Sequence, residues 1–199
     1  MLSLLSKTIL AFALTTLLSA AQPPPELLGR WRSIETSKGG IGSMLRFRPN
    51  GVVDFSPGAI VEMTYRIDGG EIIFPPATTN GPEQRQKMEF IGTDRLRLAE
   101  ARFTRSGAAL DAKNPILGEW VGRREMDGQQ VDAYFFFYPA GKSLLLMPFE
   151  TIPGHYTIQG STMRLELPDH KVAEGKFQIE GDVLTAPSSS GPANRYRRY

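Results

Sequence analysis

Apolar and polar residues alternate with a period of two along much of the chain. Leu45 and Phe47, for example, are separated by Arg46, and short segments with the same alternation recur every eight to twelve residues. Alternation of this kind is typical of a strand with one buried and one solvated face. Pairs that favour tight hairpins, such as Asn50-Gly51, stand between these segments. Helical periodicity is not evident after residue 21, so the pattern predicts an antiparallel meander.

The predicted fold is therefore all-β. Two tandem up-and-down meanders, either small barrels or curved sheets, are expected after an N-terminal signal helix. One larger barrel or sandwich shared by both halves is the alternative, because about 80 residues make a small core. The second meander is expected to follow the same plan from 118 to 199. In the first half we expect eight strands, at 29–35, 41–49, 51–56, 61–68, 70–75, 85–92, 94–99 and 101–105.

Five short motifs occur twice, in the same order. The two tryptophans of the chain, Trp31 and Trp120, lie 89 residues apart within the first of these motifs. Ordered matches with slightly changing spacing indicate a duplication with small changes in loop length. The predicted organisation is a first repeat at 26–105, a linker at 106–115 and a second repeat at 116–199. The matching segments are 27–31 with 116–120, 47–51 with 137–141, 65–69 with 156–160, 94–96 with 182–184, and 102–105 with 195–198.

The N-terminus has the pattern of a cleavable secretory signal peptide. Lys7 is its only charge, an uncharged and mainly apolar run covers 8–18, and Ser19-Ala20-Ala21 offers small residues for cleavage near Ala21. The apolar run is too short to span a bilayer comfortably. An uncleaved N-terminal anchor is the alternative. We expect a secreted or periplasmic protein without stable membrane insertion, since no later segment is long and apolar enough to cross.

Charge and cysteine content narrow the classes of function. The formal charge of +2 becomes +1 without Lys7, which does not favour nucleic acid as a partner. The one basic cluster, 195–199, interleaves arginine with tyrosine, a pattern that can bind single strands but that has a simpler structural explanation below. The chain has no cysteine, which excludes disulfides, thiolate chemistry and a lipidated cysteine. Stability must come from burial alone.

A Gly-x-Trp at the first strand, the meander and an arginine in the last strand together resemble the lipocalin-like (calycin) family. The resemblance implies that the tryptophan closes one end of each barrel and that the arginine packs across it. Each repeat has about half the usual length of that family and lacks its long helix, so its interior can be filled by side chains. The matching residues are Gly29, Trp31 and Arg102 or Arg105 in the first repeat, and Gly118, Trp120 and Arg195 or Arg198 in the second.

One hairpin of the second repeat is apolar on both faces. Where the first repeat has Arg46 and Arg48, the second has Phe136 and Tyr138. Such a patch is larger than a monomer usually leaves exposed. Three interpretations stand: the first repeat covers it, a homodimer or other protein partner covers it, or it forms a groove for a lipid or small apolar ligand. The patch consists of Tyr134, Phe136, Tyr138, Leu144 and Leu146.

Candidate catalytic chemistry is sparse. Of the two histidines, His155 lies in a predicted strand and His170 in a polar turn, and only a pairing of His155 with Glu150 suggests an acid and a base. We find no metal-ligand spacing and no phosphate-binding loop, and expect no cofactor. The sequence thus predicts an exported, non-catalytic binding or protein-interaction protein. The alternatives are a carrier of a small apolar ligand or lipid, and an enzyme with its active site at a barrel mouth.

Overall fold

The structure is a computed structural model that describes residues 22–76, 81–126, 128–167 and 171–199. The predicted signal segment, residues 1–21, lies outside these ranges. Every pair of neighbouring strands in the described residues is antiparallel, and two short 3₁₀ turns, η1 (Pro25–Leu27) and η2 (Pro139–Gly141), are the helical elements. None of the described helices has the length and apolar character that crossing a membrane requires. The prediction of an all-β antiparallel fold is confirmed.

The strands follow the predicted hairpins closely, because alternating segments pair across turns built on glycine. In the first predicted repeat they are β1 (Gly29–Ser33), β2 (Ile41–Phe47), β3 (Val52–Thr64), β4 (Arg66–Asp68), β5 (Glu71–Phe74), β6 (Gln84–Ile91), β7 (Arg95–Leu98) and β8 (Ala101–Ser106). In the second they are β9 (Gly118–Met126), β10 (Gln129–Tyr138), β11 (Lys142–Pro148), β12 (Ile152–Gln159), β13 (Thr162–Leu167), β14 (Lys171–Lys176), β15 (Gln178–Glu180), β16 (Val183–Ala186) and β17 (Asn194–Arg198).

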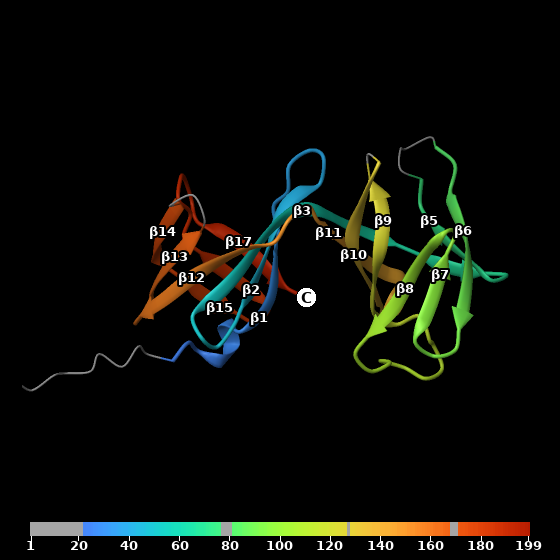
Figure 1. The fold of residues 1–199 in the computed structure, drawn as a ribbon, viewed down its shortest axis with the longest axis horizontal. Coiled ribbons are helices and arrows are strands. Elements are labelled where there is room, and N and C mark those ends of the chain that lie inside the picture. Colours follow the sequence, from blue (N-terminus) through green and yellow to red (C-terminus); the bar gives the residue numbers. More distant parts are fainter. Residues whose placement is uncertain (1–21, 77–80, 127, 168–170) are drawn as a thin grey trace, which may run out of the picture.

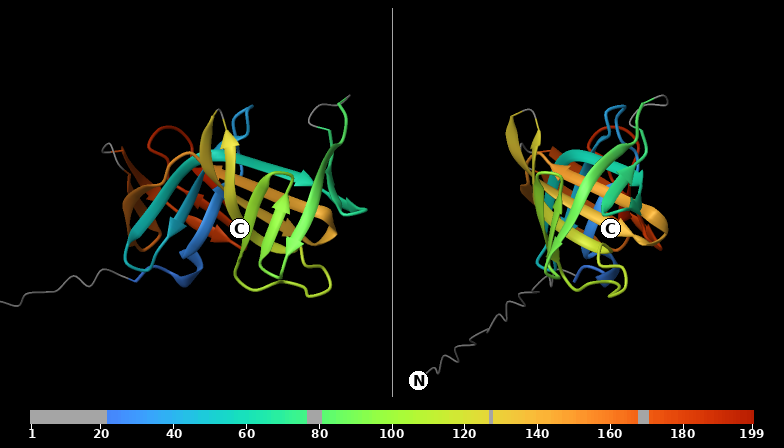
Figure 2. Two further views of the ribbon diagram at one scale, coloured as in Figure 1. Left: turned by 45° about the vertical axis from the view of Figure 1, so that its right-hand side comes forward. Right: turned by 90° about the vertical axis from the view of Figure 1, so that its right-hand side faces the viewer.

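These strands curl around two separate cores, so that the molecule has two lobes. Lobe I consists of β1, β2, the start of β3 and β12–β17, and lobe II of the end of β3 and β4–β11. Figure 1 shows the lobes side by side with β3 running from one to the other, and Figure 2 shows the same crossing from two further directions. The sheet is open and is not closed into a barrel, with breaks between strands at Tyr65 and Phe177. The curved-sheet form of the predicted fold is therefore the observed one.

Strand β3 joins the lobes because its two halves pair with different strands. Residues 52–55 pair with β12, and residues 58–64 pair with β11. Close approach of β11 requires a glycine at the crossing point. A Cβ at Gly58 would lie 2.4 Å from the Met147 carbonyl oxygen, a distance that only displacement of the backbone could relieve. The sequence pattern suggested a break between 56 and 61, whereas the strand continues through Pro57, Gly58 and Ala59.

Each lobe combines strands from both predicted repeats. The core of lobe I packs Trp31, Leu45 and Phe47 of the first repeat against residues of the second such as Met163 and Leu184. The core of lobe II is the reverse arrangement, with the first-repeat residues Ile72, Phe74, Leu96, Leu98 and Phe103 against Trp120, Ala133, Phe135, Phe137 and Leu145. The first three strands of each repeat are thus exchanged between lobes. Each core depends on both halves of the chain.

Candidate functional site

The tryptophan of each Gly-x-Trp motif is covered by an arginine from the other predicted repeat. The guanidinium of Arg198 lies 4.2 Å from the centre of the Trp31 ring, and that of Arg105 lies 4.2 Å from Trp120. Both tryptophans are fully buried and donate to a backbone carbonyl, of Leu27 at 2.8 Å and of Ile116 at 2.7 Å. The expected packing of arginine and tryptophan within one repeat is wrong, because the exchange of strands places each arginine on the partner repeat's tryptophan.

The glycines of this motif have a geometric role as well. Gly29 and Gly118 adopt φ of 116° and 119°, which residues with a side chain rarely adopt. A Cβ would lie 3.0 Å from Arg198 Nη1 at the first glycine and 3.2 Å from Arg105 Nη1 at the second. Each glycine therefore leaves room for the arginine, which also donates to the carbonyl of Leu28 or Leu117. These contacts give the glycine, tryptophan and arginine of each motif a structural role.

The other candidate arginines of the last strands do not reach a tryptophan. Arg102 is exposed on β8, and Arg195 is exposed on β17 with Nη1 3.6 Å from the Glu35 carboxylate. Because successive residues of a strand point to opposite faces, the two candidate arginines of each closing strand, three residues apart, point to opposite faces, and only one of them can reach the tryptophan. In each case the arginine nearer the end of the strand is the stacked one.

The five predicted patch residues lie together in the seam between the lobes. Phe136, Leu144 and Leu146 are 5%, 2% and 0% exposed, so they offer little surface to a partner. They pack against Met44 and Ile60 of the first repeat. Tyr134 and Tyr138 are half-buried at the two ends of this cluster, and Tyr199 packs beside them. The hairpin is apolar on both faces because one face fills the core of lobe II and the other contacts lobe I.

The ion pair between Arg30 and Glu119 crosses the seam. Both terminal nitrogens of Arg30 on β1 donate to the carboxylate of Glu119 on β9, each at 2.6 Å, and the guanidinium stands 5.2 Å from the Tyr199 ring centre. The hydrogen bond with Glu119 raises the pKa of Arg30 above its ordinary value. Arg30 and Glu119 occupy matching positions in the two Gly-x-Trp motifs. Opposite charges at matching positions of the two motifs are a sequence signal for this pair.

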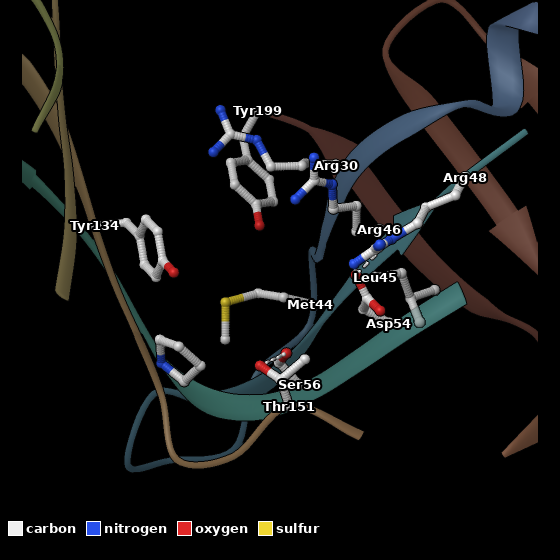
Figure 3. A pocket seen from close by; sticks show the side chains of 11 residues that line it. Arg30, Met44, Leu45, Arg46, Arg48, Asp54, Ser56, Tyr134, Thr151 and Tyr199 are labelled. Atoms are coloured by element: carbon white, nitrogen blue, oxygen red, sulfur yellow. Dashed lines mark hydrogen bonds and ion pairs between the residues drawn. The ribbon is translucent and has the colours of Figure 1, made fainter. Parts of the chain in front are cut away.

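The seam has a small hollow at its Tyr134 end, the Tyr134 hollow, of about 240 Å³. Figure 3 shows Tyr134 on one side and the arginines of β1 and β2 on the other. Arg48 is paired with Asp54 at 2.6 Å, and the hydroxyls of Ser56 and Thr151 lie 2.9 Å apart at the base. Carboxylates therefore neutralise Arg30 and Arg48, whereas Arg46 has no ion pair in the described residues.

Tyr199 makes alkaline stability a test of the seam. Burial raises its pKa from 10.0 to about 12. The folded protein keeps this proton at pH values where the unfolded chain releases it. The contribution of Tyr199 to stability is therefore complete below pH 10 and is lost as the pH rises toward 12. This difference in pKa between the folded and unfolded states corresponds to about 2–3 kcal/mol of unfolding free energy. We expect Tyr199→Phe to reduce this alkaline loss in urea titrations at a series of pH values, and the half-buried Tyr134→Phe to reduce it less. Equal slopes for wild type and Tyr199→Phe would contradict a buried hydroxyl.

Lobe I contains a hollow of its own, which we call the cup, of about 320 Å³. Its inner wall is apolar and formed by buried side chains of the core, among them Leu45, Leu165 and Ala173. Exposed polar residues, including Lys171 and Asn194, stand at its rim. Burial raises the pKa of Tyr196, which lies in the same wall, so its hydroxyl stays protonated at neutral pH. The cup is an apolar cavity with a polar mouth.

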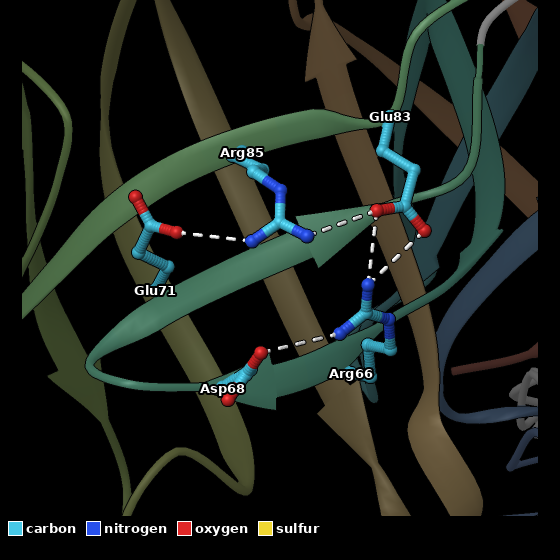
Figure 4. A network of polar contacts seen from close by, with 5 residues as sticks. All are labelled: Arg66, Asp68, Glu71, Glu83 and Arg85. Atoms are coloured by element: carbon cyan, nitrogen blue, oxygen red, sulfur yellow. Dashed lines mark hydrogen bonds and ion pairs between the residues drawn. The ribbon is translucent and has the colours of Figure 1, made fainter.

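The outer surface of lobe II carries a network of exposed ion pairs. Figure 4 shows Arg66 and Arg85 on β4 and β6 between three carboxylates, those of Asp68, Glu71 and Glu83. Arg66 lies 2.9 Å from Glu83 and Arg85 lies 3.3 Å from Glu71. Their side chains are 42% to 66% exposed, and such pairs contribute little stability each. The charges satisfy one another, so the network forms a solvated face.

His155 forms no hydrogen bond or ion pair with an acid in the described residues, Glu150 included. Its side chain is exposed on β12. His170 lies outside those ranges. The described residues also contain no group of three His, Cys, Asp or Glu side chains placed to hold a metal.

Comparison of the chain with known proteins finds no matching family model, curated protein or solved structure.

Proposed function

We propose that the chain is an exported, non-catalytic, lipocalin-like binding protein that carries a small apolar ligand in the cup of lobe I. The observation that carries the proposal is the cup itself. A volume of about 320 Å³ is at the lower end of ligand pockets, which are typically 300–1,000 Å³, lined mainly by apolar groups with a few polar ones. The signal-peptide pattern of residues 1–21 supports export.

The lining of the cup favours binding over catalysis. Its polar groups are hydroxyls, one amide and the ammonium of Lys171, with no carboxylate or imidazole among the described lining residues. General acid–base catalysis needs a group that can take and return a proton near neutral pH. Lys171 at the mouth suits the polar end of a ligand, while Leu165 and Phe55 suit its apolar body.

We also propose that the two halves of the chain arose by duplication. Several contacts occur twice at matching positions, among them arginine over tryptophan, and a tyrosine hydroxyl that donates to the carbonyl of the residue after the Phe of the second strand. The second pair consists of Tyr65 on Tyr138 and Tyr156 on Arg48. Repeated tertiary contacts of this kind are what a duplicated unit with exchanged strands would retain.

Filling the cup tests the proposed function. Ala173→Phe places a ring in the cavity, and we expect it to weaken binding of N-phenyl-1-naphthylamine, a neutral apolar fluorophore, by about tenfold or more, because each 1.4 kcal/mol of lost contact is a factor of ten. Fluorescence titration measures the affinity.

Glu174→Phe is the matched control, since it adds the same ring one residue further along β14, on the exposed face. It breaks only the exposed pair with Arg164, which costs little. Wild-type affinity in both variants would show that the cup is not the site.

A further inference from the structure

The Tyr138 end of the seam has a second hollow, the Tyr138 hollow, of about 560 Å³. It lies between the lobes, separate from the cup, and is bordered by β1 and β17 of lobe I and by β3, β10 and β11 at the edge of lobe II. Leu144 and Tyr138 belong to the seam cluster and form part of its wall. The space is large enough for an organic molecule rather than a single ion.

Arg32 lines this hollow with hydrogen-bonding capacity that the protein does not fill. Its side chain is only 9% exposed, and its Nε has no hydrogen-bond partner in the described residues. Nη1 donates to the Ser33 carbonyl over a long 3.4 Å, and Nη2 contacts the Glu62 carboxylate. Leaving a buried donor of a charged group unsatisfied is unfavourable for the folded state. A buried, underused guanidinium at a cavity wall is a site for an anionic acceptor.

The surrounding charges favour the same kind of ligand. Lys142 and Arg197 also border the hollow, whereas Glu62 is the single acidic residue in its described lining and already faces Arg32. Arg197 has a weak, exposed pair with Asp182 at 3.4 Å, which leaves much of its charge available. The uncompensated charge of the wall is positive, and buried or partly buried charges are screened less by salt than exposed ones.

The remainder of the wall suits an apolar or aromatic body. The partly exposed rings of Tyr138 and Tyr199 supply apolar contact beside the cations. Burial raises the pKa of Tyr138, so its hydroxyl is a neutral donor at physiological pH and adds no repulsion toward an anion. The hollow therefore combines cationic donors with an apolar surface.

We propose that the Tyr138 hollow binds a small organic anion whose carboxylate, sulfonate or phosphate group faces Arg32 and whose apolar body lies on the rings of Tyr138 and Tyr199. The inference is independent of the cup, because the two hollows share no lining residue. It assigns a second ligand class to the molecule, with charge as the distinguishing property.

The test uses 8-anilinonaphthalene-1-sulfonate, an aromatic sulfonate, with the Ala173→Phe chain so that the cup is blocked. We expect fluorescence titration to show saturable binding that weakens as ionic strength rises. Arg32→Met is expected to reduce the affinity by about tenfold or more, and Lys142→Glu by about fivefold, because each removes charge beside the sulfonate. Lys176→Glu makes the same charge change on an exposed position of β14 and should leave the affinity unchanged.

Circular dichroism establishes that each variant is folded, and Lys142→Glu decides the question if Arg32→Met fails to fold. Equal affinity for the sulfonate in Lys142→Glu and Lys176→Glu would overturn the proposal, as would the absence of saturable binding to the cup-blocked chain. Neutral N-phenyl-1-naphthylamine binding this chain as tightly as the sulfonate would show that charge does not select the ligand, and would also overturn it.

Discussion

Cleavage of the chain inside the linker is expected to leave a single folded complex of two fragments, each of which is unfolded when isolated. The core of lobe I needs Trp31 and Phe47 from one fragment and Leu184 from the other, and the core of lobe II is divided in the same way. An isolated fragment can complete neither core, and roughly 80 residues without a complete core do not fold stably. The expected effect is the loss of all cooperative unfolding in each isolated fragment.

A protease site inserted between Leu110 and Asp111, both exposed, allows the experiment on the whole protein. After cleavage, size-exclusion chromatography should give one peak that contains both fragments, and unfolding should become dependent on concentration, because the linker no longer holds the halves together. Fragments separated in denaturant should regain β-sheet circular dichroism only when mixed. A cooperative transition in either fragment alone would show that each repeat folds by itself and would contradict the exchange.

The hairpins were predictable from the sequence because their signals are local. Alternation fixes which residues of β2 and β7 are buried, and turn pairs such as Asn50-Gly51 set where strands end. Of the two predicted forms, small barrels or curved sheets, the structure has the curved sheets, in which Tyr65 and Phe177 interrupt the strands. Local signals specify neighbours in a meander, but whether the last strand meets the first depends on the twist accumulated around the whole lobe.

The exchange of strands could not be predicted from the same signals. A repeat folded on itself and a repeat exchanged with its neighbour contain the same types of contact, so both arrangements are compatible with the same alternation and turns. The distinguishing features are at the crossing: Gly58 permits contact with β11, and Pro57-Gly58 continues an extended strand where a break was expected. Their meaning depends on a partner strand about 90 residues away in sequence, as the register of Gly58 with Pro148 shows.

The candidate sites at the seam could likewise be predicted only in part from the sequence. The apolar patch on β10 and β11 was identifiable from its composition, and burial by the first repeat was one of its three interpretations. Its position between two hollows was not, because the hollows arise from how two curved surfaces meet. Arg32 in particular looks like any outward-facing strand arginine in the sequence, and only tertiary packing leaves its Nε buried without a partner.

Truncation of a single tryptophan should destabilise the protein more than any other point substitution. The destabilised strands should belong mainly to the other half of the chain. Trp31→Ala is expected to destabilise the protein by about 3–5 kcal/mol, because it removes a fully buried indole and leaves a cavity. The substitution also removes the aromatic ring on which the Arg198 guanidinium packs. Chemical denaturation monitored by the fluorescence of Trp120 or by circular dichroism measures the change.

Hydrogen exchange then shows which strands lose protection. Because Trp31 packs in lobe I, its loss should increase amide exchange in β12, β13 and β16 of the second repeat more than in β5–β8 of its own repeat. Trp120→Ala is the matched variant and should have the opposite distribution, with faster exchange in β5, β7 and β8. If each substitution instead increased exchange in the later strands of its own repeat, each half of the chain would have its own core. The seam and its two hollows, which need strands from both halves, would then be contradicted as well.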